Sequence, residues 1–276
     1  QRARSFLNGE TRLFGIVGHP VVQTRSPGVF SHEFHARGVN AVLVPIDLSP
    51  WNFATAFPAL LAIDNLDGLV ITVPHKAAVL PWLDRIAPRA AAGGAVSVLA
   101  RALDGKWVGD LFDGAGCCAA IEARGAQLDG RTVQLLGAGG AGSSIALEVL
   151  TRAPRELRIH DPDDARLTAL LARLLPHAGT ARVVTGLGPA DILINASPVG
   201  MHAPKDCPFP AELLTHDMIV MDCVTEPEIT RLLDLALRCG AIAVTGREMF
   251  DSQVDAVCDF FAHVKKSSAE EVVFHR

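Results

Sequence analysis

The sequence contains no tyrosine, and its cysteines and histidines lack the spacing of metal ligands. Its six cysteines form no C-x-x-C pair, and its ten histidines form no H-x-x-x-H or H-E-x-x-H pair. A structural zinc site usually draws on such pairs, so we expect no bound metal. In a chain of 276 residues, this cysteine usage favours reduced, buried thiols in a cytoplasmic protein over a disulfide framework.

Long apolar runs are also missing, because Asp, Pro or Arg interrupts each one before the roughly 20 residues that a membrane helix needs. The first ten residues, QRARSFLNGE, lack the apolar core of a signal peptide. The net charge is only -5, which argues against nucleic acid or an anionic membrane as the partner.

What the chain does have is a regular alternation of apolar runs with helix-like stretches. In its first part we expect strands at 12–18, 41–47 and 67–73, and helices at 27–37, at 50–62 and onward to about residue 85. This order predicts an α/β unit with a mostly parallel sheet. Asp104-Gly105 then separates two extended runs and predicts a tight hairpin.

The alternation restarts in the second half of the chain. Strands are expected at 132–137, 156–161, 181–186, 191–197, 218–223 and 241–246. Helices are expected at 141–150, up to about 175, at 229–239 and at 249–264. Two α/β units joined near residue 115 are the simplest organisation, and both are long enough to be domains.

The strand TVQLLG runs directly into GAGGAG, which is followed by a good helix. The G-x-G-x-x-G pattern consists of Gly137, Gly139 and Gly142. Glycines there permit a tight turn and a close approach of the backbone to a pyrophosphate, and the helix N-terminus favours the phosphate charge. The pattern therefore predicts a dinucleotide site, with an ordinary glycine-rich turn as the alternative.

The next strand ends at Asp161, where a dinucleotide site reads the adenosine ribose. A carboxylate there accepts hydrogen bonds from both ribose hydroxyls and repels a 2′-phosphate. Asp163 and Asp164 add to that repulsion, with Arg158 and Arg166 nearby to oppose it. NAD is therefore favoured over NADP. The alternative is that Asp161 simply caps the following helix.

Six segments carry motifs that follow one another along the chain. They are GHPVVQTRSP (18–27), GLVITVPHK (68–76), GDLFDGAG (109–116), NASPVGM (195–201), DCVTEPEIT (222–230) and GREMFDSQ (246–253). In this order they resemble the motifs of the shikimate/quinate dehydrogenase family over nearly the whole chain. The ordered set is far more specific than any one of its members.

The resemblance implies an N-terminal substrate-binding catalytic domain over residues 1–114, completed by a C-terminal helix at 249–276. It also implies a Rossmann-type NAD(P)-binding domain over 115–248, with the substrate in the cleft between the two domains. The implied chemistry is reversible hydride transfer between nicotinamide and a ring hydroxyl of a cyclic polyol acid. The implied cofactor-binding residues are Gly137, Ala138, Gly139, Gly140, Ala141, Asp161, Asn195, Ser197, Met201 and Gly246.

The same resemblance makes Lys76 and Asp113 the catalytic pair. Oxidation of an alcohol requires a group that takes the hydroxyl proton. Desolvation in a closed cleft favours the neutral form of a lysine, whereas a neighbouring carboxylate favours the charged form and orients the amine. The alternatives are a solvated Lys76 on a helical turn and an Asp113 that caps the next helix. The substrate-binding residues implied are Thr24 and Ser26 for a carboxylate, with Thr72, Ser97, Thr225 and Gln253 around the rest of the pocket.

Several polar positions of the family pattern are apolar or shorter in this chain. Val70 stands in place of an asparagine, Ser97-Val98 and Leu111-Phe112 each stand in place of Asn-Thr, and Thr225 stands in place of a tyrosine. A pocket that loses hydrogen-bond partners should bind a hydroxylated ligand more weakly. We therefore expect a paralogue with an altered substrate, such as quinate, an amino-substituted analogue or a less hydroxylated ring acid.

Two other functions remain open at this point. A sensor that binds NAD or a cyclic acid without turnover needs neither Lys76 nor Asp113, whereas both are present. An ordinary NADP-dependent shikimate dehydrogenase of aromatic amino-acid biosynthesis is less favoured because of Asp161. The family includes monomers and homodimers, and the sequence does not choose between them.

Overall fold

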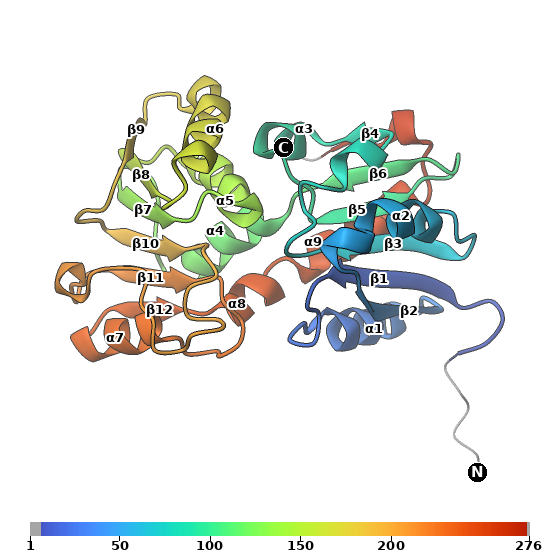
Figure 1. The fold of residues 1–276 in the computed structure, drawn as a ribbon, viewed down its shortest axis with the longest axis horizontal. Coiled ribbons are helices and arrows are strands. Elements are labelled where there is room, and N and C mark those ends of the chain that lie inside the picture. The colour runs from blue at the N-terminus through green and yellow to red at the C-terminus, as the bar shows by residue number, and fades with distance from the viewer. Residues whose placement is uncertain (1–6, 275–276) are drawn as a thin grey trace, which may run out of the picture. The chain divides into compact units, whose positions relative to one another are not determined.

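The computed structural model describes residues 7–274, which form two compact units (Figure 1). The first unit runs to Leu111 and resumes at Val254, and the second comprises Phe112–Gln253. Each has its own six-stranded sheet. Within residues 7–274, no helix is long and apolar enough to cross a membrane.

The sheet of the first unit has the order β2-β1-β3-β5-β6-β4. Its strands are β1 (Arg12–Gly18), β2 (Ala41–Asp47), β3 (Leu66–Ile71), β4 (Arg85–Ile86), β5 (Val98–Arg101) and β6 (Trp107–Asp110). β1 is parallel to β2 and β3, whereas β5 is antiparallel to β3 and β6. The predicted hairpin is confirmed, since Gly105 takes a positive φ of 82° between β5 and β6.

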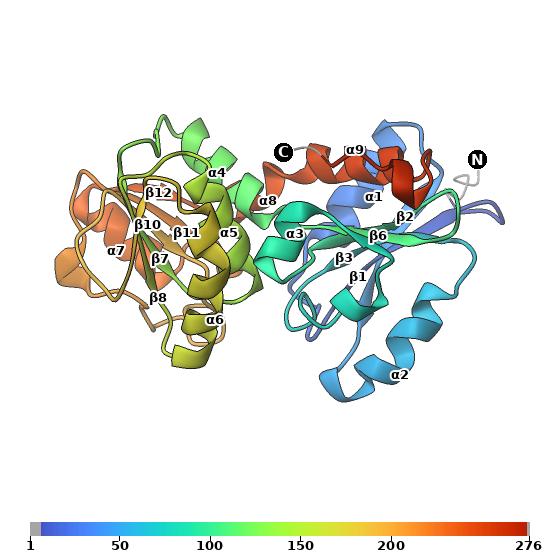
Figure 2. The same ribbon diagram turned by 90° about the horizontal axis from the view of Figure 1, so that it is seen from above.

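Helices cover both faces of this sheet: α1 and α9 lie on one side and α2 on the other (Figure 2). The helices of the unit are α1 (Ser26–Ala36), α2 (Pro50–Leu61), α3 (Pro88–Gly93) and α9 (Val254–Val264), with short 3-10 turns at Leu80–Trp82 and Ala269–Glu271. Phe261 of α9 lies 4.7 Å from Phe14 of β1, ring centroid to ring centroid. A Cβ at Gly68 would come within 2.7 Å of the Phe261 ring, so a glycine in β3 makes room for α9.

Two helix predictions were wrong, one within this unit and one where the chain returns to it from the second unit. The stretch after β3 forms turns, a 3-10 turn and β4 in place of a helix up to residue 85. Pro74 and Pro81 explain this, because each lacks an N–H for a helical hydrogen bond. The helix expected at 249–264 is also broken in two, into α8 (Gly246–Asp251) and α9, and the hydroxyl of Ser252 donates to the Glu248 carbonyl at the break.

The sheet of the second unit is parallel throughout, in the order β12-β11-β10-β7-β8-β9. Its strands are β7 (Thr132–Leu136), β8 (Glu156–His160), β9 (Arg182–Thr185), β10 (Ile192–Asn195), β11 (Ile219–Asp222) and β12 (Ile242–Val244). Its helices are α4 (Asp113–Ala123), α5 (Gly140–Leu150), α6 (Asp164–Leu174), α7 (Arg231–Cys239) and α8, with 3-10 turns at Leu175–His177 and Ala211–Leu213. The strand order reverses between β7 and β10, and ligands of such sheets bind at the carboxyl ends of the strands beside this point.

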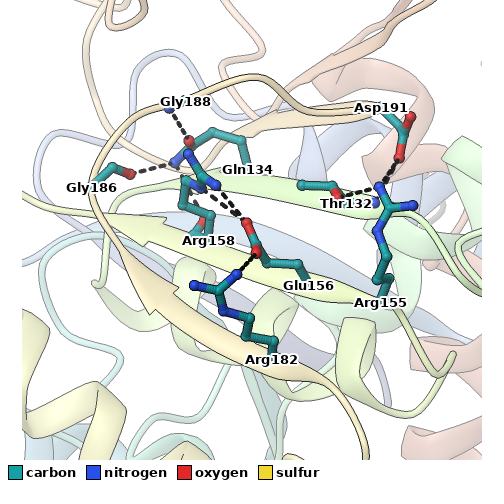
Figure 3. Close-up of polar contacts among 9 residues, drawn as sticks. All are labelled: Thr132, Gln134, Arg155, Glu156, Arg158, Arg182, Gly186, Gly188 and Asp191. Carbon is teal, nitrogen blue, oxygen red and sulfur yellow. Dashed lines mark hydrogen bonds and ion pairs between the residues drawn. The ribbon is translucent and has the colours of Figure 1, made fainter.

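No helix joins β9 to β10, and buried polar side chains hold the connecting loop to the sheet instead (Figure 3). Gln134 of β7 is fully buried; its side-chain nitrogen donates to the Gly186 carbonyl (3.1 Å) and its oxygen accepts from the Gly188 N–H (3.1 Å). Arg158 of β8, beside Gln134 in the strand register, occupies the space that a Cβ at Gly188 would need. The loop thus covers this sheet face in place of a helix.

Gln134→Leu is expected to lower the free energy of unfolding by about 1–3 kcal/mol, because it leaves the Gly188 N–H and the Gly186 carbonyl buried without their partner. Urea denaturation of both proteins measures the difference. Gln127→Leu is the matched control, because Gln127 is exposed and forms no such bond. Equal stability of the Gln134→Leu variant and the parent protein would show that the loop does not depend on this side chain.

Candidate functional site

The predicted substrate residues of the first unit gather at the carboxyl ends of β1 and β3. Thr72 directly follows β3, and its N–H donates to the Val17 carbonyl of β1 (2.9 Å). A Cβ at Gly18 would overlap the Thr72 methyl group, so the glycine at the end of β1 lets these strand ends approach closely. Lys76 is half-buried, and its carbonyl accepts from the Val96 N–H (2.8 Å). These backbone bonds fix Lys76 next to the chain that enters β5.

Ser97 joins this group through its own backbone. Its carbonyl accepts from the Ile71 N–H (2.7 Å) and its N–H donates to the Asp110 carbonyl (2.9 Å), and the residue is 5% exposed. Thr72, Lys76 and Ser97 are therefore brought together, although 25 positions of chain separate the first from the last.

Thr24 and Ser26 occupy the turn between β1 and α1. The Thr24 hydroxyl donates to the Val21 carbonyl (2.7 Å), which leaves its oxygen able to accept a further hydrogen bond. Ser26 is the first residue of α1, and Pro27 follows it, as is common in a first helical turn. Ser26 is 3% exposed, so the structure places this hydroxyl in the interior of the unit.

Two of the positions at which this chain departs from the family pattern are direct neighbours. Val70 pairs with Val98 across the antiparallel strands β3 and β5. Val98 is buried, as are Leu111 and Phe112, which replace polar residues farther on. The departures therefore include one apolar cross-strand pair, and such pairs stabilise a sheet by packing.

Sequence reasoning missed an ion pair between the half-buried Arg89 and the buried Asp110 in this unit. The Arg89 guanidinium donates two hydrogen bonds to the two carboxylate oxygens of Asp110, each 2.7 Å long. Asp110 also accepts from the Leu111 N–H (2.7 Å), while its carbonyl holds Ser97 as described. The pair thus fixes the end of β6 and, through it, the start of β5.

In the second unit, residues 137–142 form a glycine loop that leads from β7 into α5. Gly137 has a positive φ of 98°, which favours glycine. A Cβ at Gly142 would overlap the Gly137 carbonyl oxygen, whereas nothing lies within 4 Å of the Cβ position of Gly139. Gly139 is the N-cap of α5 and offers no capping side chain, so the first N–H groups of the helix are available. This cradle fits the pyrophosphate of a dinucleotide.

Asp161 directly follows β8 and binds this loop. One carboxylate oxygen accepts from the Ala138 N–H (2.7 Å) and the other from the Asp163 N–H (2.9 Å), and the residue is 4% exposed. The alternative role as cap of the next helix is wrong, because the Asp163 carboxylate caps α6 by accepting from the Arg166 N–H (3.0 Å). The Arg166 guanidinium is exposed and lies 3.6 Å from Asp161.

Asn195 lies at the end of β10 and is completely buried. Its side-chain nitrogen donates to Asp222 (3.0 Å) and to the Val199 carbonyl (3.2 Å). Its side-chain oxygen accepts from the N–H (3.0 Å) and the hydroxyl (2.6 Å) of Ser197. The side chain therefore bonds within the protein, while Ser197 and Met201 are half-buried in the loop that follows.

Asp222, the partner of Asn195, lies at the end of β11. Besides Asn195, its carboxylate accepts from the Val224 N–H (3.0 Å) and the Thr230 hydroxyl (2.7 Å). The half-buried Thr225 lies in the loop that Val224 begins. Gly246, the first residue of α8, packs against this loop, since a Cβ there would lie 2.5 Å from the Val224 carbonyl oxygen.

Burial raises the pKa of Asp222 to about 6, although the three hydrogen bonds oppose this shift. The folded protein therefore holds this proton more tightly than the unfolded chain, in which the pKa is near 3.8. The contribution of Asp222 to stability is present below about pH 4 and falls, by on the order of 3 kcal/mol, as the pH rises to about 6. The neighbouring Cys207 thiol stays neutral over this pH range, because burial raises its pKa.

Urea denaturation between about pH 4.5 and pH 7.5 tests this sign. The stability of the parent protein minus that of an Asp222→Asn variant is expected to decrease as the pH rises, because only the parent protein titrates at this position. A difference that stays constant over the range would contradict the shift.

Asp113 is the first residue of α4 and is buried, and the N-cap of this helix is Phe112. The alternative role of Asp113 as the N-cap is therefore wrong. Close packing fixes the start of α4 on α5: the Gly114 N–H donates to the Ser144 hydroxyl (2.7 Å), and a Cβ at Gly114 would overlap the Ser144 carbonyl oxygen.

Gln253 approaches the same helix one turn farther on. A Cβ at Gly116 would lie 3.2 Å from the Gln253 Cβ, and residues three apart on a helix share a face. The second unit thus brings Asp113 and Gln253 to one side of α4. Cys117 is the next residue of α4, and its thiol contacts Cys223; this contact and burial raise the pKa of the Cys117 thiol well above its ordinary value.

Proteins similar to this chain are known both by sequence and by structure. Residues 16–99 match the family model of the shikimate dehydrogenase substrate binding domain. The shikimate dehydrogenase (NADP(+)) of Rubrobacter xylanophilus is 37% identical over 250 residues, which cover 88% of each chain.

Among solved structures, quinate dehydrogenase from Corynebacterium glutamicum in complex with NAD is 30% identical, with a TM-score of 0.79 over 91% of this chain and 93% of that one. The 5-ketofructose reductase of Gluconobacter sp. strain CHM43 is 27% identical, with a TM-score of 0.79 over 94% and 95%. Sequence and fold therefore lead to one conclusion: the chain belongs to the shikimate dehydrogenase family of nicotinamide-dependent oxidoreductases.

Proposed function

We propose that this protein is an NAD-preferring oxidoreductase that acts on a cyclic hydroxy acid related to, but different from, shikimate. When bound, the nicotinamide would accept or supply the hydride at a ring carbon of this acid. The glycine loop at 137–142 and Asp161 would hold the dinucleotide. The observation that carries the cofactor preference is the position of Asp161.

The Asp161 carboxylate is fixed against the glycine loop by its bond from the Ala138 N–H. Each carboxylate oxygen accepts more than one hydrogen bond, so acceptor capacity remains for ribose hydroxyls. A 2′-phosphate at the same place would meet this negative charge, and Asp163 adds a second one nearby. Arg166 is the cation closest to these groups, but it already pairs with both carboxylates.

Lys76 is proposed to move the proton of the reacting hydroxyl at its Nζ atom, with Asp113 as its partner. Thr24 and Ser26 would bind the carboxylate of the acid, and the position of Ser26 in the first turn of α1 suits an anion. Thr72, Ser97, Thr225 and Gln253 would contact the remainder of the ring.

The substrate is proposed to carry fewer or differently placed hydroxyls than shikimate. Val70, Val98, Leu111 and Phe112 offer no side-chain hydrogen bond where the family pattern has polar residues. Each polar group of a ligand left without a partner costs about 1–3 kcal/mol. Relatives named quinate dehydrogenase and 5-ketofructose reductase support this proposal, since this fold accommodates substrates other than shikimate.

The test is the near-ultraviolet absorbance of the reduced nicotinamide, recorded with NAD and then NADP across shikimate, quinate, amino-substituted analogues and less hydroxylated ring acids. Turnover with NAD, strongest on an acid other than shikimate, is the expected result. Preference for NADP would overturn the role of Asp161, and best activity on shikimate would overturn the altered substrate. Dinucleotide binding without turnover on any acid would favour a sensor.

A further inference from the structure

The motif DCVTEPEIT ends in Thr230, which is connected through hydrogen bonds between buried side chains to the turn on which the glycine loop rests. Thr230 is the N-cap of α7, and its hydroxyl accepts from the Leu233 N–H (3.3 Å) and donates to Asp222 (2.7 Å). Asp222 in turn accepts from Asn195 (3.0 Å). All three residues, Asn195, Asp222 and Thr230, are at most 1% exposed, so none of them offers surface to a ligand.

The buried network of Asn195, Asp222 and Thr230 controls the chain that leaves β10. The Asn195 side-chain oxygen accepts two hydrogen bonds from Ser197 and thereby sets the turn after the strand. The carbonyl group of Ala196 and the nitrogen of Ser197 lie 3.0 Å from the position of a Cβ on Gly137. The glycine loop therefore rests directly on the turn that Asn195 shapes.

The same network also fixes the loop that follows β11. Asp222 accepts from the Val224 N–H on the same oxygen that faces Asn195, and the Cys223 N–H donates to the Asn195 carbonyl (2.9 Å). The two loops at the carboxyl ends of β10 and β11 are thus fixed by one carboxylate. Its third partner, Thr230, supplies the only bond to its other oxygen among the described hydrogen bonds.

We infer that Asp222 and Thr230 are positioning residues for dinucleotide binding. They hold the glycine loop in place through Asn195 and the Val224–Thr225 loop through the Asp222 carboxylate itself, without touching the ligand. The inference rests on the proposed dinucleotide site. It also gives Asn195 a positioning role in place of the direct contact that the family resemblance implied.

Thr230→Val and Thr230→Ser form the matched pair that tests it. Valine keeps the shape of the side chain and removes the hydroxyl, whereas serine keeps the hydroxyl. The Kd for NADH, and in parallel for NADPH, is measured by fluorescence titration well below the Tm of each variant, with no substrate present. Thr230→Val is expected to raise the Kd by about tenfold and Thr230→Ser by no more than about twofold. Asp222→Asn keeps the volume, removes one acceptor, and is expected to resemble Thr230→Val.

Leu174→Ala is the control for lost stability alone. Leu174 is fully buried in the last turn of α6 and contacts neither loop through a hydrogen bond, and its truncation leaves a cavity. A Kd that rises equally in Leu174→Ala and Thr230→Val, or equally in Thr230→Ser and Thr230→Val, would overturn the inference.

The outcome separates this inference from the proposed function. A parent protein that binds neither NADH nor NADPH would overturn both. A parent protein that binds a dinucleotide but oxidises no ring acid would overturn the proposed function alone, since the comparison of Thr230→Val with Thr230→Ser needs only binding.

Discussion

Replacement of Lys76 by alanine is expected to lower kcat by about 10²–10⁴-fold, because it removes the group proposed to move the hydroxyl proton. The Kd for the dinucleotide should not change, since the residues that would hold it, the glycine loop and Asp161, belong to the second unit. Steady-state rates on the best ring acid and a fluorescence titration with NADH measure the two quantities separately.

Lys76→Arg distinguishes proton transfer from a purely electrostatic role. A guanidinium keeps the positive charge but does not give up its proton in proteins, so this variant should be nearly as impaired as Lys76→Ala. Recovery of most of the activity by arginine would instead assign Lys76 to substrate charge. Lys106→Ala is the control, because Lys106 is an exposed lysine of the same unit, paired with Asp104 and Glu270, and its loss should leave the rates unchanged.

The strands were predictable because their signal is local. Apolar runs such as those of β1 and β7 are buried on both faces, and the glycines that end them mark the turns. The region from about 74 to 85 was predicted wrongly as a helix, because its apolar residues recur at helical spacing while Pro74 and Pro81 interrupt the helical hydrogen bonds. A proline inside a periodic pattern is visible in the sequence, so this error was avoidable.

The bonds that build the site were not predictable in the same way, because they join residues that are distant in the sequence. Arg89 and Asp110 are 21 positions apart, and Asn195 and Asp222 are 27 apart. The sequence shows that Asn195 follows an apolar run, but only the parallel pairing of β10 with β11 brings its side chain against Asp222. The sequence shows that these four side chains are polar or charged, but only the fold shows how deeply each one is buried and which partner it has.

Asp161→Ser is expected to lower the ratio of kcat/KM with NAD to kcat/KM with NADP by about 100-fold. The variant removes the carboxylate that would accept from the ribose hydroxyls of NAD and repel the 2′-phosphate of NADP. It also leaves the Ala138 N–H without its partner. That loss weakens the binding of both dinucleotides by the same factor, so it cancels in the ratio. The ratio therefore measures only how well the site distinguishes NAD from NADP.

Asp163→Ser is the matched control for this experiment. It removes the same charge two positions away, while serine still caps α6 as Asp163 does. If the position of Asp161 decides the preference, the ratio in Asp163→Ser should change by no more than a few-fold, because an exposed charge is screened by salt. An equal change in both variants would instead assign the preference to the summed negative charge of this turn. Because Arg166 pairs with both carboxylates, each variant removes one partner of this cation, so the comparison of the two variants leaves the position of the lost charge as the difference.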